Sequence, residues 1–121
     1  MNILTKLIEL EEEATNFGFK WDNSEQIMRQ ILSECSEVEV HLNDKNKEKL
    51  QEEIGDLLHA IFTLCAFNKI NPLETLENSV YKFERRFRIV QQLAKEQGYT
   101  SLKGESFEKL MELWDVAKRT I

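Results

Sequence analysis

Two pairs of acidic residues with the same spacing carry the chemistry that this sequence offers. Glu34 and Glu37 lie three positions apart in SECSE, and Glu53 and Asp56 repeat that spacing in EEIGD. Residues three apart on a helix are surface neighbours, so the members of each pair point the same way. If the two helices form an antiparallel hairpin, the four carboxylates face one another and repel. Such a site must take up protons or bind cations, and Mg²⁺ or Mn²⁺ suits oxygen ligands.

The alternative is that these acids are ordinary solvated surface residues. The chain has 22 acidic residues, so one pair at this spacing is weak support for a metal site. Two pairs that each border an apolar stripe favour the metal site more strongly. Gly55, between Glu53 and Asp56, costs about 1 kcal/mol relative to alanine in a helix interior and leaves room for a backbone or ligand to approach. Plain drift is the other explanation for this glycine.

The pattern predicts an all-α fold, an antiparallel helical bundle of about five helices in one domain over residues 1–121. A single proline and four glycines suit long helices rather than many strands and turns. Stop signals lie at Gly18 and Gly98, and Asn23 or Ser24 and Glu105 or Ser106 are the expected caps. The expected helices cover residues 3–16, 25–42, 48–67, 73–97 and 106–118.

Helical periodicity places a core stripe on the second and third helices. On the second helix it comprises Ile27, Ile31, Cys35, Val38 and Leu42, and on the third Leu50, Ile54, Leu57, Leu58, Ile61 and Cys65. Beyond Asp56 the third helix is apolar nearly all round, so we expect neighbours to cover it on several sides. Because 121 residues leave few helices for that purpose, a partner chain is also expected.

Basic and aromatic residues in the last two helices supply groups that suit a nucleotide. In the fourth helix Phe83, Phe87 and Val90 follow the expected core stripe, while Lys82 and Arg86 flank it and are placed to grip a polyphosphate. In the fifth helix Trp114 and Lys118 lie four apart, where the ring could stack on a base and the ammonium reach a phosphate. The alternatives are a solvated basic face and a tryptophan that belongs to the core.

Composition excludes several classes of function. A net charge of -6 and a pI near 5.0 argue against binding of nucleic-acid polymers, which requires a basic face. Cys35 and Cys65 are expected to be buried free thiols in a reducing compartment. The amino terminus turns acidic too early for a signal peptide, and the apolar run 57–67 is too short for a bilayer, so a cytoplasmic protein is expected. His41 is interpreted as a polar neighbour of the acids rather than a ligand.

The acidic motifs resemble a known family. ECSE, followed after fourteen residues by EEIGDLL, is similar to the E-x-x-E…E-x-x-D signature of the MazG-type nucleoside triphosphate pyrophosphohydrolases, in the all-α NTP pyrophosphatase superfamily. GFKW, KFERRF and LWDVAK resemble the same family in the same order, so the likeness covers about residues 17–119. It is strongest to the carboxy-terminal domain of two-domain MazG proteins, and the family's His-Pro-His element is absent.

The resemblance implies an activity, its site residues and an assembly. It implies Mg²⁺-dependent hydrolysis of a nucleoside triphosphate to the monophosphate and pyrophosphate by a homodimer with four-helix-bundle packing. The implied metal ligands are Glu34, Glu37, Glu53 and Asp56, with Glu37 and Glu53 as catalytic residues. The implied nucleotide contacts are Gln30, Lys49, Lys82, Arg86, Trp114 and Lys118. Gln30 stands where the family often has a lysine, which affects the grip on the nucleotide.

Three alternatives remain open from the sequence. The substrate could be narrower, such as dUTP, dCTP, a damaged nucleotide or phosphoribosyl-ATP. The chain could instead be a helical dimerisation module whose acids are only solvated, or a sensor that binds a metal–nucleotide complex without turnover.

Overall fold

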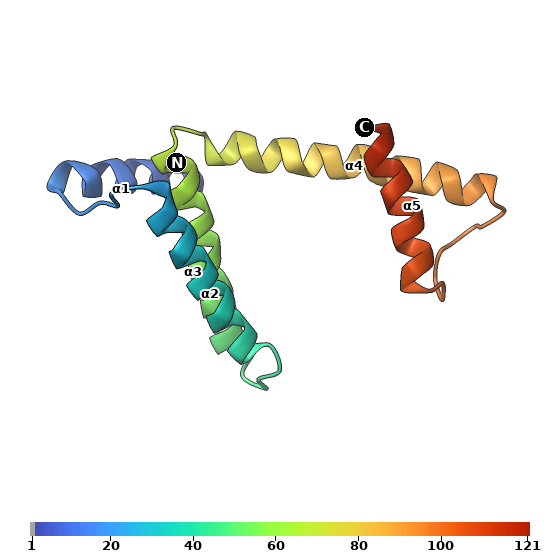
Figure 1. The fold of residues 1–121 in the computed structure, drawn as a ribbon, viewed down its shortest axis with the longest axis horizontal. Helices are drawn as coiled ribbons and strands as arrows, with labels where there is room; N and C mark the ends of the chain where they lie inside the picture. The colour runs from blue at the N-terminus through green and yellow to red at the C-terminus, as the bar shows by residue number, and fades with distance from the viewer. Residues whose placement is uncertain (1) are drawn as a thin grey trace. The chain divides into compact units, whose positions relative to one another are not determined.

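The protein is described here by a computed structural model that covers residues 2–121, and these residues form five α-helices and no strand. The helices are α1 (Ile3–Phe17), α2 (Ser24–His41), α3 (Lys47–Phe67), α4 (Pro72–Glu96) and α5 (Phe107–Thr120) (Figure 1). The all-α prediction is therefore confirmed. None of the described helices is long and apolar enough to cross a membrane.

Side-chain caps explain where the helices begin. The Asn23 side chain accepts a hydrogen bond from the backbone N–H of Gln26 at 2.9 Å, and the Ser106 hydroxyl accepts one from Lys109 at 3.1 Å. These bonds satisfy backbone donors that a first helical turn leaves without partners. Asparagines occupy the equivalent position before the other three helices, namely Asn2, Asn46 and Asn71. The caps fix the starts of all five helices within two residues of the predicted ones.

Glycines end the first and fourth helices, as predicted. Gly18 has φ 99° and Gly98 has φ 88°, both in the left-handed region that glycine enters without a steric penalty. The next residue in each case, Phe19 or Tyr99, donates its N–H back to a carbonyl of the last helical turn at 2.9 Å.

The chain divides into two compact units, residues 1–75 and 76–121, which are described separately. In the first unit α2 and α3 form an antiparallel hairpin across a short connection, and α1 contacts α3 (Figure 1). In the second unit the remainder of α4 packs on α5 through the buried side chains of Val90, Leu113 and Ala117. The expectation of a single domain stays a prediction.

The predicted core stripe of α3 is wrong for three of its six residues, while Leu50, Leu57 and Cys65 are half-buried. Ile54, Leu58 and Ile61 keep 41%, 49% and 39% of their surface exposed. The buried residues of α3 are instead Glu53, Ala60 and Thr63, on a stripe displaced by one residue, or about 100° around the helix. The helix therefore turns small and polar residues toward its neighbours in the chain and leaves its aliphatic stripe outside.

Three other core predictions need correction. Leu42 is exposed, although Ile27 of the same stripe is fully buried. Phe83 and Phe87 are also exposed on α4 and stack on each other with ring centroids 6.0 Å apart, whereas Val90 is the buried residue of this stripe. Cys35 and Cys65 are free thiols as expected, but they are only half-buried.

Gly55 lies in the interior of α3, where a Cβ would meet open space within the described residues. Gly55→Ala should therefore stabilise the protein by about 0.5–1 kcal/mol, because alanine is the better helix former. The same change at Gly18 should destabilise it by about 1–2 kcal/mol, because φ there is left-handed. Urea unfolding followed by circular dichroism measures both effects. A loss of stability in both variants would contradict the open environment of Gly55.

Candidate metal and nucleotide site

The α2–α3 hairpin brings three of the four predicted acids to one place. Glu34 comes from α2, while Glu53 and Asp56 come from α3. One carboxylate oxygen from each lies within 4.8 Å of the other two. Glu34 is half-buried and Asp56 is exposed, so the cluster opens to solvent on one side.

The fourth acid belongs to an overlapping group on the same hairpin. Glu37 and His41 of α2 lie with Glu53 of α3, again with their candidate ligand atoms within 4.8 Å of one another. Glu53 is common to both groups. The four predicted acids are thus linked through the Glu53 carboxylate. His41, interpreted from sequence as a polar neighbour, is close enough to Glu37 and Glu53 to share a metal ion with them.

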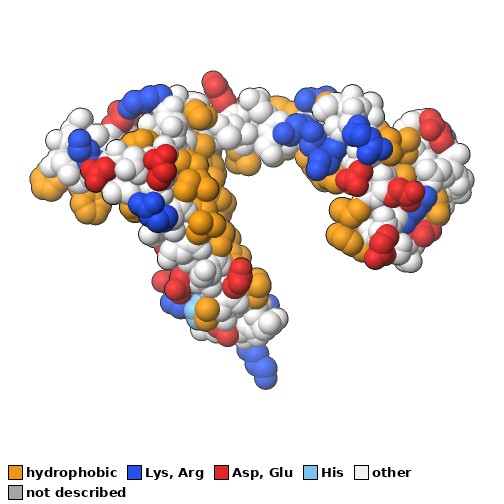
Figure 2. Space-filling model, viewed as in Figure 1, with side chains coloured by type: hydrophobic (Ala, Val, Ile, Leu, Met, Phe, Trp, Pro, Cys, Tyr) orange, Lys and Arg blue, Asp and Glu red, His pale blue; other side chains and the backbone are white. Residues whose placement is uncertain are grey.

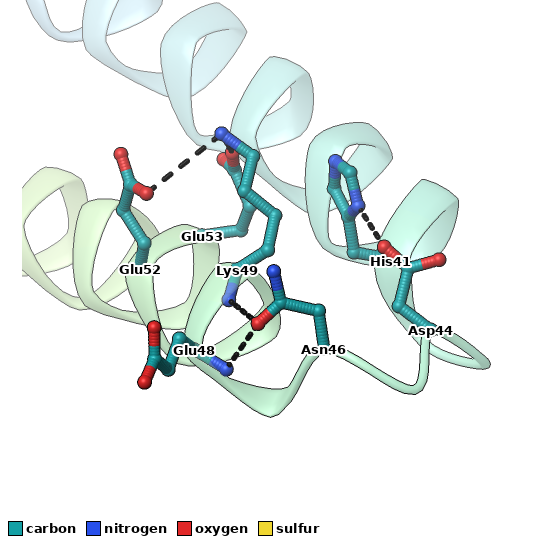
Figure 3. Close-up of polar contacts among 7 residues, drawn as sticks. All are labelled: His41, Asp44, Asn46, Glu48, Lys49, Glu52 and Glu53. Atoms are coloured by element: carbon teal, nitrogen blue, oxygen red, sulfur yellow. Dashed lines mark hydrogen bonds and ion pairs between the residues drawn. The ribbon is translucent and has the colours of Figure 1, made fainter.

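Glu53 keeps only 7% of its surface exposed, and a lysine balances its charge. The Nζ of Lys49 lies 3.2 Å from Oε1 of Glu53 and 3.7 Å from Oε2 of Glu52 (Figure 3). Since a buried carboxylate is costly without a positive partner, this ion pair compensates for the loss of solvation. The hydrogen bond to Glu53, with the nearby charge of Glu52, raises the pKa of Lys49 above its ordinary value of 10.5.

Gln30 orients Glu34, the half-buried acid of the cluster. Its Nε2 donates a hydrogen bond to Oε1 of Glu34 at 2.7 Å, one helical turn away. The residue that departs from the family's lysine therefore contacts a carboxylate of the cluster. A neutral donor in this position holds Glu34 without cancelling its negative charge.

A groove of about 1330 Å³ lies beside the cluster within the first unit. Glu34, Asp56 and Gln30 line it together with Lys20 and Trp21 of the connection between α1 and α2. Sequence reasoning did not assign Lys20 and Trp21 to the site, although both lie in the GFKW segment. An ammonium group and an indole beside clustered acids are suited to the phosphate and base of a nucleotide.

One wall of this groove is held by polar contacts between α1 and α3. The Thr63 hydroxyl donates to Oε1 of Glu11 at 2.8 Å, and Nε2 of His59 lies 3.3 Å from the same oxygen. No local sequence pattern predicts this contact, because Glu11 and Thr63 lie 52 positions apart.

The other four predicted nucleotide contacts belong to the second unit. Lys82 and Lys118 are exposed, whereas Arg86 and Trp114 are half-buried and contact each other, with the guanidinium carbon 5.9 Å from the ring centroid. Trp114 also packs against Phe83, with ring centroids 5.9 Å apart. The Nε of Arg86 is buried and has no hydrogen-bond partner among residues 2–121. Arg86 and Trp114 thus form one preassembled pair of a cation and an aromatic ring.

Comparison with known proteins identifies the class to which this helical, acid-lined hairpin belongs. Residues 22–91 match the family described as the MazG nucleotide pyrophosphohydrolase domain. The matched segment contains α2, α3 and all four clustered acids. The chain belongs to this family, as the resemblance of its motifs predicted.

Individual relatives show the same relationship. The chain is 33% identical over 109 residues to the nucleoside triphosphate pyrophosphohydrolase/pyrophosphatase MazG of Thermotoga maritima, covering 90% of this chain and 41% of that protein. It is 30% identical over 118 residues to the nucleoside triphosphate pyrophosphohydrolase of Escherichia coli K12, covering 96% and 44%. A phosphoribosyl-ATP pyrophosphatase of Bacillus cereus is 35% identical over 71 residues, covering 59% and 64%. The chain thus spans less than half the length of the first two relatives.

Lys49→Met should lower the thermal unfolding midpoint near neutral pH without divalent ions, because Glu53 loses its counter-charge. The pKa of Lys49 is raised in the folded protein, so its stabilising contribution is complete below pH 10.5 and is lost as the pH rises through the raised value. The difference between variant and unaltered protein should therefore close at alkaline pH. Lys47→Met is the matched control, since Lys47 makes no ion pair with residues 2–121. A difference that persists far above pH 10.5 would contradict this account.

Proposed function

We propose that this chain hydrolyses a nucleoside triphosphate to the monophosphate and pyrophosphate in a Mg²⁺-dependent reaction. The observation that carries the proposal is the carboxylate cluster of the α2–α3 hairpin, which lies inside the segment matching the MazG family. The activities for which the longer relatives from Thermotoga maritima and Escherichia coli are named support the same reaction class.

The donor set suits a hard divalent ion. Glu34, Glu53 and Asp56 offer only oxygen atoms and open toward solvent, and Mg²⁺ favours a few carboxylates together with waters and substrate phosphate. Mn²⁺ shares these preferences and is the second choice. When bound, such an ion lowers the pKa of a coordinated water and neutralises phosphate charge.

Glu37 is the best placed carboxylate to act on the attacking water. It is exposed, so it is free to accept a proton at the mouth of the cluster, whereas Glu53 is buried and paired with Lys49. Glu53 contributes to catalysis by holding both groups of ligands together. A polyphosphate that enters the site also offers Lys49 an anionic partner other than Glu53.

The remaining cations would bind the departing pyrophosphate and the nucleoside. The guanidinium of half-buried Arg86 would donate to phosphate oxygens, and exposed Lys82 would add a second positive charge. Trp114 supplies an aromatic ring and Lys118 a second ammonium group. Trp21 and Lys20 offer the same two chemistries in the groove of the first unit.

A second copy of the chain is the expected partner. The exposed Ile54, Leu58 and Ile61 form a continuous aliphatic stripe along α3, and Figure 2 shows hydrophobic side chains gathered along the hairpin. An exposed stripe of this kind on one face of a helix is the usual basis of a symmetric helical interface.

The decisive experiment for the activity uses Asp56→Asn. Asp56 is exposed, so the substitution should leave the circular dichroism spectrum unchanged while it lowers pyrophosphate release at least about 100-fold, the order expected for loss of a metal-dependent step. Glu52→Gln is the matched control, since it removes an acid of the same helix that belongs to neither ligand group.

The substrate panel should contain each common NTP and dNTP and phosphoribosyl-ATP with Mg²⁺, with products separated by chromatography. Release of pyrophosphate from several nucleotides supports the proposal, and release from one alone narrows the substrate. Turnover by Asp56→Asn at the unaltered rate would reject the metal assignment. Binding of nucleotide without any product would identify a sensor, and absence of both binding and a Mg²⁺-dependent thermal shift would identify a structural module.

Leu58→Glu tests the assembly, because a charge in the middle of the exposed α3 stripe should convert a dimer to a monomer. Sedimentation velocity measures the change. Ile3→Glu is the control, since Ile3 is also an exposed aliphatic residue, with 73% of its surface exposed against 49% for Leu58, but lies at the start of α1. A dimer that survives Leu58→Glu would place the interface elsewhere.

A further inference from the structure

We propose that Glu37, His41 and Glu53 form a mixed nitrogen–oxygen site for a transition-metal ion of the Zn²⁺ or Co²⁺ class, next to the oxygen-only site. This site extends the metal centre of the proposed function, on which the assignment of Glu37 and Glu53 as metal ligands rests. It adds a histidine ligand and a different metal preference.

The geometry of the hairpin supplies three ligands from two helices. Glu37 and His41 are four residues apart on α2, so their side chains project from the same face. Glu53 reaches them from α3, and the three candidate ligand atoms lie within 4.8 Å of one another. Two ligands from one helical turn and a third from the facing helix can occupy three positions around a single ion.

The orientation of the imidazole is fixed by a second carboxylate. Nδ1 of His41 contacts Oδ2 of Asp44 in the connection between α2 and α3 (Figure 3). Because an ionised carboxylate only accepts hydrogen bonds, the neutral tautomer that fits this contact carries its proton on Nδ1 and leaves the lone pair on Nε2. A histidine that donates one ring nitrogen to a carboxylate and offers the other to a metal is the usual arrangement in protein metal sites. Asp44 is thus a positioning residue for His41.

The chemistry of this donor set separates it from the neighbouring cluster. An imidazole nitrogen raises the affinity for Zn²⁺, Co²⁺ and similar ions far more than for Mg²⁺, which favours oxygen and keeps its waters. Glu34, Glu53 and Asp56 offer oxygen alone, so one hairpin presents two donor sets of different selectivity around the shared Glu53. Burial keeps the Glu53 carboxylate out of bulk water, so its charge requires a positive partner. Lys49 supplies one, and a bound metal ion would share Glu53 with that lysine.

The second histidine of the chain provides a matched control. His59 lies on α3, is largely exposed and contacts Glu11, and it belongs to neither ligand group. Zn²⁺ titration of the full chain by calorimetry, with Mg²⁺ in excess and no nucleotide, compares His41→Gln, Asp44→Asn and His59→Gln. Asp44→Asn should weaken Zn²⁺ binding about 10- to 100-fold, as expected when the partner of a metal-bound histidine is removed. His41→Gln should weaken it at least as much, and His59→Gln should bind as the unaltered protein does.

A spectroscopic measurement keeps the proposal testable if a variant fails to fold. In the unaltered protein, Zn²⁺ should shift the imidazole Nε2 resonance of His41 and leave that of His59 unchanged, while Mg²⁺ should shift neither. Equal Zn²⁺ affinity in His41→Gln, or an unshifted His41 resonance at saturating Zn²⁺, would overturn the proposal. The Zn²⁺ titration contains no nucleotide and is therefore independent of the activity assay. If the chain binds Zn²⁺ as expected but releases no pyrophosphate in the substrate panel, only the proposed function is rejected.

Discussion

A carboxylate buried between two helices is the constraint on which the rest of this site depends. Glu53 lies in the packed face of α3, where an aliphatic residue would ordinarily be expected, and it belongs to both groups of candidate ligands. Its charge requires a positive partner in contact with it. In the structure that partner is Lys49, held one helical turn away by an ion pair whose other end is half-exposed. Lys49 stabilises the buried carboxylate of Glu53. A metal ion that binds Glu53 would have to displace this lysine or share the carboxylate with it.

The close packing of α2 against α3 explains how the acids come so near one another. The residues that α3 buries besides Glu53 are Ala60 and Thr63, which line the groove beside α1, where Thr63 donates a hydrogen bond to Glu11. A short connection then fixes the two helices side by side, so that acids from both reach the same few ångströms. If the two helices were not held side by side, the same motif would leave four solvated acids with no common ligand volume.

The sequence predicted those features that depend on local spacing. Helix starts follow from single capping side chains such as Asn23 and Ser106, and the convergence of Glu34, Glu53 and Asp56 follows from i,i+3 geometry and a short connection. The α3 stripe was misassigned because periodicity reports which residues avoid water but not whether they pack within the chain or on another one. The contact of Glu11 with Thr63 joins distant segments, and no local pattern announces it.

Charge balance sets the number of ions that the proposed reaction requires. Within the first unit, the carboxylates of Glu34, Glu37, Glu53 and Asp56, together with the ion-paired Glu52 and Lys49, leave a net charge of four minus, since Gln30 is neutral. One divalent ion would leave the site negative, and a polyphosphate would still be repelled. Two divalent ions would neutralise the site and let the substrate approach, which favours a two-ion centre for the proposed reaction. A lysine in place of Gln30 would reduce the negative charge by one, so the proposed reaction would rely more heavily on metal ions in this chain than in a relative with that lysine.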